Sequence, residues 1–139
     1  MIIVFLDSNV LISALIGGPK AAPVVLVDWL AGDPGSALVT GRCCVQEVDR
    51  NLARKLPYAQ PLWEQFLFAT AIRIVPCPRA PLRGINEKDQ PVVGAAMMAG
   101  ATHFVTGDKR LLAEMRVGKG RLPLALAPRE MLELLVAGI

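Results

Sequence analysis

The chain has 139 residues, of which 53% are hydrophobic, and a net charge of +3. This length fits one domain over residues 1–139 that can bury a core without metal or disulfide staples. The longest apolar runs are shorter than the ~18–20 residues of a membrane span, and the amino-terminal run lacks the basic segment of a signal peptide, so we expect a cytoplasmic protein without a membrane segment. The modest positive charge permits a polyanionic partner, and the apolar surplus is consistent with a homodimer interface.

The three cysteines, Cys43, Cys44 and Cys77, do not have the spacing of a known site. Their number is odd, two of them are adjacent, and no C-x-x-C pattern is present. We therefore expect reduced residues that fill space, rather than a zinc or redox site.

The first part of the chain alternates between strand-like and helix-like segments. Residues 2–6 form a β-prone run that ends at Asp7, and residues 9–17 change to helical spacing before a glycine pair breaks the chain. A second helix is expected over 21–32, and a short strand over 36–40. This order predicts a strand–helix unit followed by a return to the sheet.

The middle of the chain continues this alternation. Helices are expected over 43–56, where an apolar stripe is followed by a proline, and over 61–71. A strand-like run at 72–76 leads into a proline-rich loop, which ends at a helix over 89–100. The remaining segments are listed here in order: a strand at 102–106, a helix at 108–115, a strand at 122–126 and an amphipathic helix at 127–138.

Strands that alternate with helices predict an α/β fold with a parallel sheet sandwiched between helices. Such sheets bind ligands outside the carboxyl ends of their strands. Asp7 and Asp108 each follow a predicted strand, so both are expected on this edge of the sheet. Taken singly, each acid is also explained as a residue that starts a helix, because an acid there caps the helix or complements its dipole.

Two further acidic positions leave alternatives open. Asp89 opens the helix over 89–100, where it is well placed to cap the backbone, and capping and metal binding can coexist at such a position. Glu47 and Asp49 flank the apolar stripe of the helix over 43–56 on opposite sides. Helical periodicity does not choose between them, and a solvated face is the default for either.

Considered together, these acids predict a cation site at one edge of the sheet. Clustered carboxylates raise one another's pKa, so such a cluster stays ionised mainly when a cation occupies it. Oxygen ligands without His or Cys suit Mg²⁺ or Mn²⁺ better than zinc.

Four segments together resemble the PIN domain family, in particular the toxin components of bacterial toxin–antitoxin pairs. These segments are FLDSNVLISAL, VQEVDRNL, EKDQPVVGAAMMAGATHFVTGDKRLL and LAPREMLELL, which together span almost the entire chain. The resemblance implies a three-layer α/β/α domain and a Mg²⁺- or Mn²⁺-dependent endoribonuclease that hydrolyses RNA phosphodiester bonds. It also implies an antitoxin protein as a partner.

The resemblance also assigns roles to individual residues. Asp7, Asp89 and Asp108 match the metal-binding acids of the family, and Glu47 matches the acid that completes the catalytic set. The choice of Glu47 over Asp49 rests on this resemblance alone. Asn9 and Thr106 match polar positions that hydrogen-bond the metal ligands or their waters, although either is also explained as a cap or turn residue.

The chain departs from related sequences, which often carry a further acid at the position of Asn86 and another at that of Gln90 or Arg110. This departure argues against a tightly held second metal ion. The basic residues that we expect to contact phosphates around the acids are Lys20, Arg42, Lys88, Lys109 and Arg110.

Two other functions account for some of the same residues. An aspartyl-phosphate phosphatase would use Asp7 as its nucleophile, but Asn9 stands where a second acid is usual. A catalytically inactive α/β module that binds RNA or a protein would retain the acids as helix caps.

Overall fold

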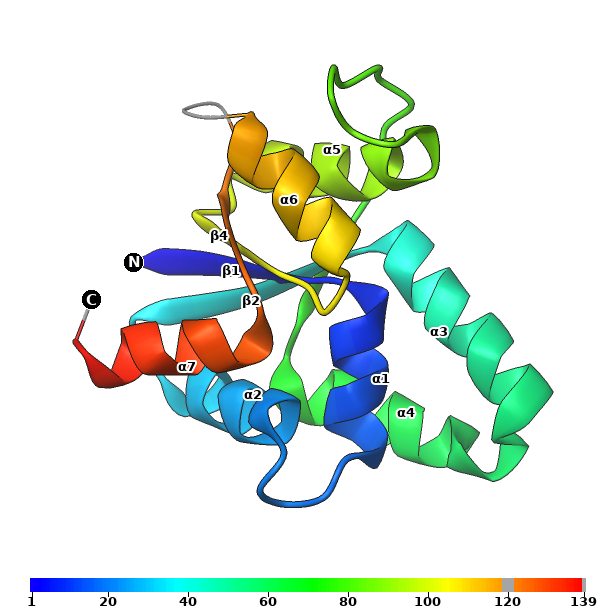
Figure 1. The fold of residues 1–139 in the computed structure, drawn as a ribbon. Helices are drawn as coiled ribbons and strands as arrows, with labels where there is room; N and C mark the ends of the chain where they lie inside the picture. The colour runs from blue at the N-terminus through cyan, green and yellow to red at the C-terminus, as the bar shows by residue number, and fades with distance from the viewer. Residues whose placement is uncertain (119–121, 139) are drawn as a thin grey trace.

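Five short parallel strands form the centre of the structure, in the order β3-β2-β1-β4-β5 (Figure 1). The computed structural model describes residues 1–118 and 122–138. The strands are β1 (Ile2–Leu6), β2 (Ser36–Gly41), β3 (Arg73–Val75), β4 (His103–Val105) and β5 (Leu124–Leu126). In the central register, Phe5 of β1 lies opposite Val39 on one side and Phe104 on the other.

Helices cover both faces of the sheet, which confirms the predicted three-layer α/β/α architecture (Figure 1). The described helices are α1 (Ser8–Ile16), α2 (Ala22–Gly32), α3 (Arg42–Lys55), α4 (Gln60–Thr70), α5 (Gln90–Met98), α6 (Lys109–Val117) and α7 (Pro128–Val136). Helices α5 and α6 lie on one side of the sheet, and α2 and α7 lie on the other. Two 3-10 turns, η1 (Pro57–Ala59) and η2 (Glu87–Asp89), were not predicted, whereas every predicted helix and strand is present within two residues at each end. No helix in the described ranges is long and apolar enough to span a bilayer.

The core explains why the central strands are apolar without alternation. A parallel sheet covered on both faces buries both sides of each strand. Val4, Phe5 and Leu6 of β1 are fully buried, and the Phe5 ring stacks on the Phe104 ring of β4 with centroids 5.2 Å apart. This packing holds the carboxyl ends of β1 and β4 in fixed positions.

The tryptophans and phenylalanines outside the strands divide between core and surface. Trp63, for which helical spacing indicates a core residue or a dimer contact, is buried, and its ring stacks on the half-buried Phe66. Helical spacing indicates core residues or dimer contacts for Trp29 and Phe68; they are 43% and 87% exposed, which excludes the core role and leaves the dimer contact as a prediction.

Asp49 joins α3 to α4 through its side chain. Its Oδ1 accepts hydrogen bonds from Trp63 Nε1 at 2.9 Å and from Gln60 Nε2 at 3.2 Å. The buried indole N–H therefore depends on this carboxylate as its acceptor. The contact identifies Asp49 as a structural residue.

We predict that Asp49→Ala lowers the free energy of unfolding by about 1–3 kcal/mol, because the buried Trp63 N–H loses its acceptor. Urea denaturation followed by circular dichroism measures this change. Asp28→Ala, at an exposed position on α2, is the matched control and should stay within about 0.5 kcal/mol of the wild type. Equal stabilities of the Asp49→Ala and Asp28→Ala proteins would contradict this role for Asp49.

Candidate functional site

The strand order places a crevice between the carboxyl ends of β1 and β4. From β1 the chain adds β2 and β3 on one side, and later returns to add β4 and β5 on the other. This reversal is a topological switch point, where α/β sheets leave an opening for ligands. Asp7 follows β1 directly, and Thr106 and Asp108 follow β4.

Asp7 is the most buried acid of the candidate site and is held by several hydrogen bonds. Its Oδ2 accepts from Thr106 Oγ1 at 2.7 Å and from Asn9 Nδ2 at 3.3 Å. Its Oδ1 accepts from the backbone N–H of Ser8 at 2.8 Å, so Asp7 is also the N-cap of α1. Only 7% of the residue is exposed. Asp7 therefore combines a capping role with a fixed, largely desolvated carboxyl group.

Asn9 links the two strand ends at this point. Its Nδ2 contacts Thr106 Oγ1 at 3.2 Å as well as Asp7, and its Oδ1 accepts the backbone N–H of Gly107 at 2.8 Å. A Cβ atom on Gly107 would lie 3.3 Å from Asn9 Oδ1, so a larger residue would crowd this contact. Asn9 and Thr106 are thus the hydrogen-bonding partners of Asp7.

The pKa of Asp7 is raised above its ordinary value of 3.8. Burial is the largest cause, and it outweighs the hydrogen bonds from Thr106 and Ser8 that favour the ionised form. The negative charges of Glu47 and Asp89 raise the pKa further. Asp7 is thus buried and is also exposed to the negative charges of Glu47 and Asp89.

Asp108 starts α6 and borders a depression beside Asn9. Its Oδ1 accepts the backbone N–H groups of Arg110 at 3.0 Å and Leu111 at 3.1 Å, which confirms the capping interpretation. Among the described residues, Oδ2 accepts no hydrogen bond. The depression has a volume of about 360 Å³ and is lined by Asn9, Val10, Ser13, Pro23, Gly107, Asp108 and Pro128.

Asp89 precedes α5 but does not cap it, which corrects the prediction from sequence. No backbone N–H of α5 is bonded to its side chain. The short turn η2 intervenes, and the capping oxygen there is Asn86 Oδ1, which accepts the backbone N–H of Lys88 at 3.1 Å. The Asp89 carboxylate, one turn further along the chain, pairs with Arg110 instead.

The Asp89 carboxylate is incompletely satisfied. Its Oδ2 atom is buried without a hydrogen-bond partner among the described residues, and the guanidinium of Arg110 forms an ion pair with it at 3.5 Å. The pKa of Asp89 is raised, mainly by burial; Lys88 and Arg110 lower it, and Asp108 and Glu114 raise it. The charge of Asp108 therefore acts on Asp89.

Sequence reasoning missed Glu114, which organises the basic residue at this edge. Its Oε2 pairs with Arg110 at 3.6 Å, and its Oε1 accepts the backbone N–H of Asn86 at 2.9 Å. The i, i+4 spacing of Arg110 and Glu114 on α6 is the signal that could have indicated the pair. Arg110 therefore lies between two acids and is not merely a solvated helix charge.

Glu47 is exposed on α3 and borders a second depression beside Asn9. This depression has a volume of about 370 Å³, and its lining comprises Ser8, Asn9, Ile12, Ile16, Glu47, Asn51, Leu52, Lys55 and Leu56. Because Asp49 is bonded to α4 instead, Glu47 is the acid of α3 that faces Asp7.

The charges of these acids act on one another, but the side chains are not gathered into a closed ligand shell. Within residues 1–118 and 122–138, no three His, Cys, Asp or Glu side chains are placed to hold one metal ion. Their oxygen chemistry and their mutual repulsion suit a hard divalent cation. Direct ligation by three of them requires side-chain movement.

The cysteines differ from the prediction. Cys43 and Cys77 form a disulfide between the start of α3 and the loop after β3, so the expectation of reduced residues is wrong for this pair. Cys44 is free and buried, and its S–H contacts Asp7 Oδ1 at 4.0 Å. Burial, followed by the charge of Asp7, raises the pKa of the Cys44 thiol to about 12.

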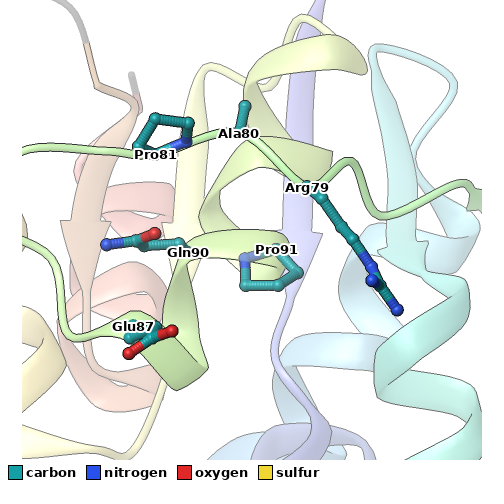
Figure 2. A pocket seen from close by; sticks show the side chains of 6 residues that line it. All are labelled: Arg79, Ala80, Pro81, Glu87, Gln90 and Pro91. Carbon is teal, nitrogen blue, oxygen red and sulfur yellow. The ribbon is translucent and has the colours of Figure 1, made fainter.

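A third depression lies where the loop after β3 passes the start of α5 (Figure 2). Its volume is about 420 Å³, and its lining comprises Arg79, Ala80, Pro81, Glu87, Gln90 and Pro91. Gln90 Nε2 fixes the loop by donating to the carbonyl groups of Leu82 at 3.4 Å and Ile85 at 3.0 Å. The depression is next to Asp89 in the chain, although no residue of the predicted acid set lines it.

Solved structures with the same arrangement support a PIN-like fold. Over 91% of its length the chain matches 97% of a chain in the crystal structure of VapBC2 from Rickettsia felis bound to a DNA fragment from their promoter, with a TM-score of 0.61 and 14% identity. PAE2754 from Pyrobaculum aerophilum matches over 98% of this chain and 90% of that chain, with a TM-score of 0.63 and 17% identity. No protein-family model and no curated protein sequence matches. At these identities the similarity establishes the fold, and the PIN-like fold predicted from the sequence segments is confirmed.

The raised pKa of Asp7 predicts how stability depends on pH. Folded protein holds this proton more tightly than unfolded protein, so the ionised carboxylate opposes folding, and this cost is absent below the unfolded value near 3.8. In chelator, the stability of Asp7→Asn relative to wild type should therefore increase as the pH rises from about 4 to about 7. Denaturant unfolding across this range measures the difference.

Asp33→Asn is the matched control with the opposite sign. Hydrogen bonds from Ser36 and Gly35 lower the pKa of Asp33, so its ionised form favours folding, and this contribution is lost as the pH falls. The Asp33 variant should lose stability relative to wild type as the pH rises. A relative stability of Asp7→Asn that does not change with pH would contradict the assignment.

Proposed function

We propose that this protein is a divalent-metal-dependent ribonuclease that hydrolyses RNA phosphodiester bonds. The observation that carries the proposal is the buried carboxylate of Asp7 at the switch point, where the charges of Glu47 and Asp89 oppose its ionisation. Burying a carboxylate and exposing it to like charges is costly for a purely structural site, and perturbed groups of this kind concentrate at functional sites. The PIN-like fold supports the same conclusion.

The residues present fit Mg²⁺ or Mn²⁺ as the cation. The buried Asp89 Oδ2 has no hydrogen-bond partner in the described parts of the chain, and the other donors are carboxylate oxygens. Asp7, Asp89 and Asp108 would hold the ion. When bound, such an ion lowers the pKa of a water molecule and neutralises charge on a phosphate.

Other residues of the chain would orient the ligands, accept a proton and contact the RNA. Thr106 and Asn9 keep Asp7 oriented through their hydrogen bonds, while Glu47, exposed at the border of the site, accepts the proton of the attacking water. The exposed basic residues that would contact the RNA backbone are Lys20, Arg42, Lys88, Lys109 and Arg110.

We further propose that the protein is the cytoplasmic toxin of a toxin–antitoxin pair. The similarity to a chain of the VapBC2 structure supports an antitoxin protein as a partner. The exposed apolar side chains of Ile16, Trp29 and Phe68 offer surface for that partner or for a second copy of the chain. Light scattering of the protein by itself detects the homodimer, and light scattering with a co-expressed partner detects the complex. A monomer at micromolar concentration would count against the homodimer.

One alternative function is favoured by a specific observation. Asp7 and Asp108 both cap helices, and no described trio of acids is arranged to hold an ion. An inactive module that binds RNA or a protein would show these features without catalysis. The phosphatase alternative has less support, because Asn9, at the position of its second acid, bridges Thr106 and Gly107.

The nuclease function predicts that Asp7→Asn and Asp108→Asn each lower the rate of RNA cleavage by ~100-fold or more, since each removes a charged oxygen ligand. A fluorogenic RNA incubated with Mg²⁺, Mn²⁺ or chelator measures the rate. Asp28→Asn is the exposed control and should cleave as wild type does. Cleavage that is unchanged in both variants, or that persists in chelator, would contradict the proposal; no cleavage by folded wild type would favour the inactive module.

The pairing of Arg110 with Asp89 predicts competition between this side chain and a cation. Arg110→Gln removes a positive charge 3.5 Å from Asp89 Oδ2, so Mn²⁺ should bind more tightly and raise the melting temperature at lower concentration. Thermal denaturation across a Mn²⁺ titration measures the shift. Arg129→Gln, at an exposed position on α7, is the control. Weaker binding in Arg110→Gln would show that Arg110 supports the ion instead of competing with it.

A further inference from the structure

The register of the sheet explains why Cys43 and Cys77 meet. Gly41 at the end of β2 pairs with Val75 at the end of β3, and each cysteine lies two residues beyond its strand. The two Cα atoms are 6.1 Å apart, within the usual range for a disulfide. A Cβ atom on Gly41 would lie 2.6 Å from Cys77 Sγ, so the absence of a side chain at this position makes room for the sulfur.

Cys77 Sγ occupies the place of an N-cap for α3. Gly41 is the N-cap residue of this helix and offers no side chain, and the backbone N–H of Cys43 donates to Cys77 Sγ at 3.2 Å. The positive end of a helix dipole and a donated N–H both stabilise a sulfur anion. This is the environment in which cysteines react with disulfides.

Cys43 and Cys77 differ from Cys44 in their exposure to solvent. Cys43 and Cys77 are half-buried, so both residues keep some contact with solvent. Cys44 is adjacent in the chain but fully buried, with its sulfur directed toward Asp7. The geometry therefore permits exchange at one pair only.

We propose that Cys43 and Cys77 are a reversible thiol–disulfide modification site that reacts with low-molecular-weight disulfides of the glutathione type. The Cys77 thiolate attacks one sulfur of glutathione disulfide and releases one glutathione thiolate. Cys43 loses its proton and attacks the Cys77 sulfur of the mixed disulfide, which releases the second glutathione. Two protein thiols and one glutathione disulfide become one protein disulfide and two glutathione molecules, and excess glutathione reverses both steps.

The bond connects two segments that lead to the acidic site. Cys43 lies on α3, one turn before Glu47, and Cys77 lies two residues before Arg79, which begins the loop wall of the depression in Figure 2. Beyond Cys77, Pro78 packs on α5, where a Cβ on Gly94 would lie 3.0 Å from Pro78 Cγ. Breaking the bond removes the covalent restraint on this loop. The chemistry of this cysteine pair does not depend on the proposed function.

Peptide mapping under native conditions tests the chemistry without any activity assay. Protein reduced and then exposed to glutathione disulfide should yield a peptide linked between Cys43 and Cys77, while Cys44 is alkylated only after denaturation. Excess glutathione should remove the link from the folded protein. A link to Cys44, no link at all, or a link that excess glutathione cannot reduce in the folded protein would overturn the proposal.

Single variants test the direction of attack. Cys43→Ser should accumulate one glutathione on Cys77, because the residue that resolves the mixed disulfide is missing. Cys77→Ser should be modified at Cys43 several-fold more slowly, since that sulfur lacks the N–H donated to Cys77. Cys44→Ala is the matched control and should form the Cys43–Cys77 link as wild type does. Faster modification of Cys43 than of Cys77 would reverse the assigned roles and overturn this mechanism.

Limited trypsin digestion measures how far the disulfide restrains the loop, independently of any RNA cleavage. Cleavage after Arg79 and Arg83, both exposed in the loop, should be several-fold faster in reduced protein and in Cys77→Ser than in oxidised protein. Equal cleavage rates in reduced and oxidised protein would show that the disulfide does not restrain the loop. If the linked peptide forms but neither oxidation state cleaves RNA, the proposed function fails while the modification site stands.

Discussion

The hydrogen bond from Thr106 Oγ1 to Asp7 Oδ2, 2.7 Å long, is the interaction on which the candidate site depends. It joins two strand ends that are far apart in the chain and adjacent in the sheet. Asn9 reinforces the junction by contacting both residues and the backbone after β4. A negative group is thereby fixed in a buried position, although burial and neighbouring acids oppose its charge. Such conflicts between stability and electrostatics are typical of functional sites.

Features encoded by local patterns could be predicted from the sequence. Apolar runs of strand length, changes to helical spacing and the glycines and prolines between them gave the α/β order and the helix boundaries. Asp7 and Asp108 were placed at one edge of the sheet because parallel strands end together. Asp108 is also confirmed as a helix cap. This role is a local one, because an acid directly before a helix bonds to the backbone of that same helix.

Features that depend on how distant segments approach could not be predicted in this way. Both Glu47 and Asp49 flank the apolar stripe of α3, and only the position of Trp63 on α4 shows which one has a structural partner. The side-chain cap predicted for Asp89 is wrong: Asp89 stands at the N-cap of α5, but it is also the last residue of an unpredicted 3-10 turn that Asn86 caps, and its own side chain accepts no backbone N–H of α5. The bond between Cys43 and Cys77 follows from the register of β2 against β3, which cysteine spacing does not report.

Anomalous diffraction from crystals soaked in Mn²⁺ tests most directly whether these acids share a cation. The repulsion around Asp7, and the Asp89 oxygen that accepts no hydrogen bond from the described residues, predict one strong anomalous peak in the crevice between β1 and β4, with oxygen atoms of Asp7, Asp89 and Asp108 turned toward it. Substitution of Asp7 by Asn should abolish the peak. No peak at this edge of the sheet, or an ion bound only elsewhere, would contradict the cation site.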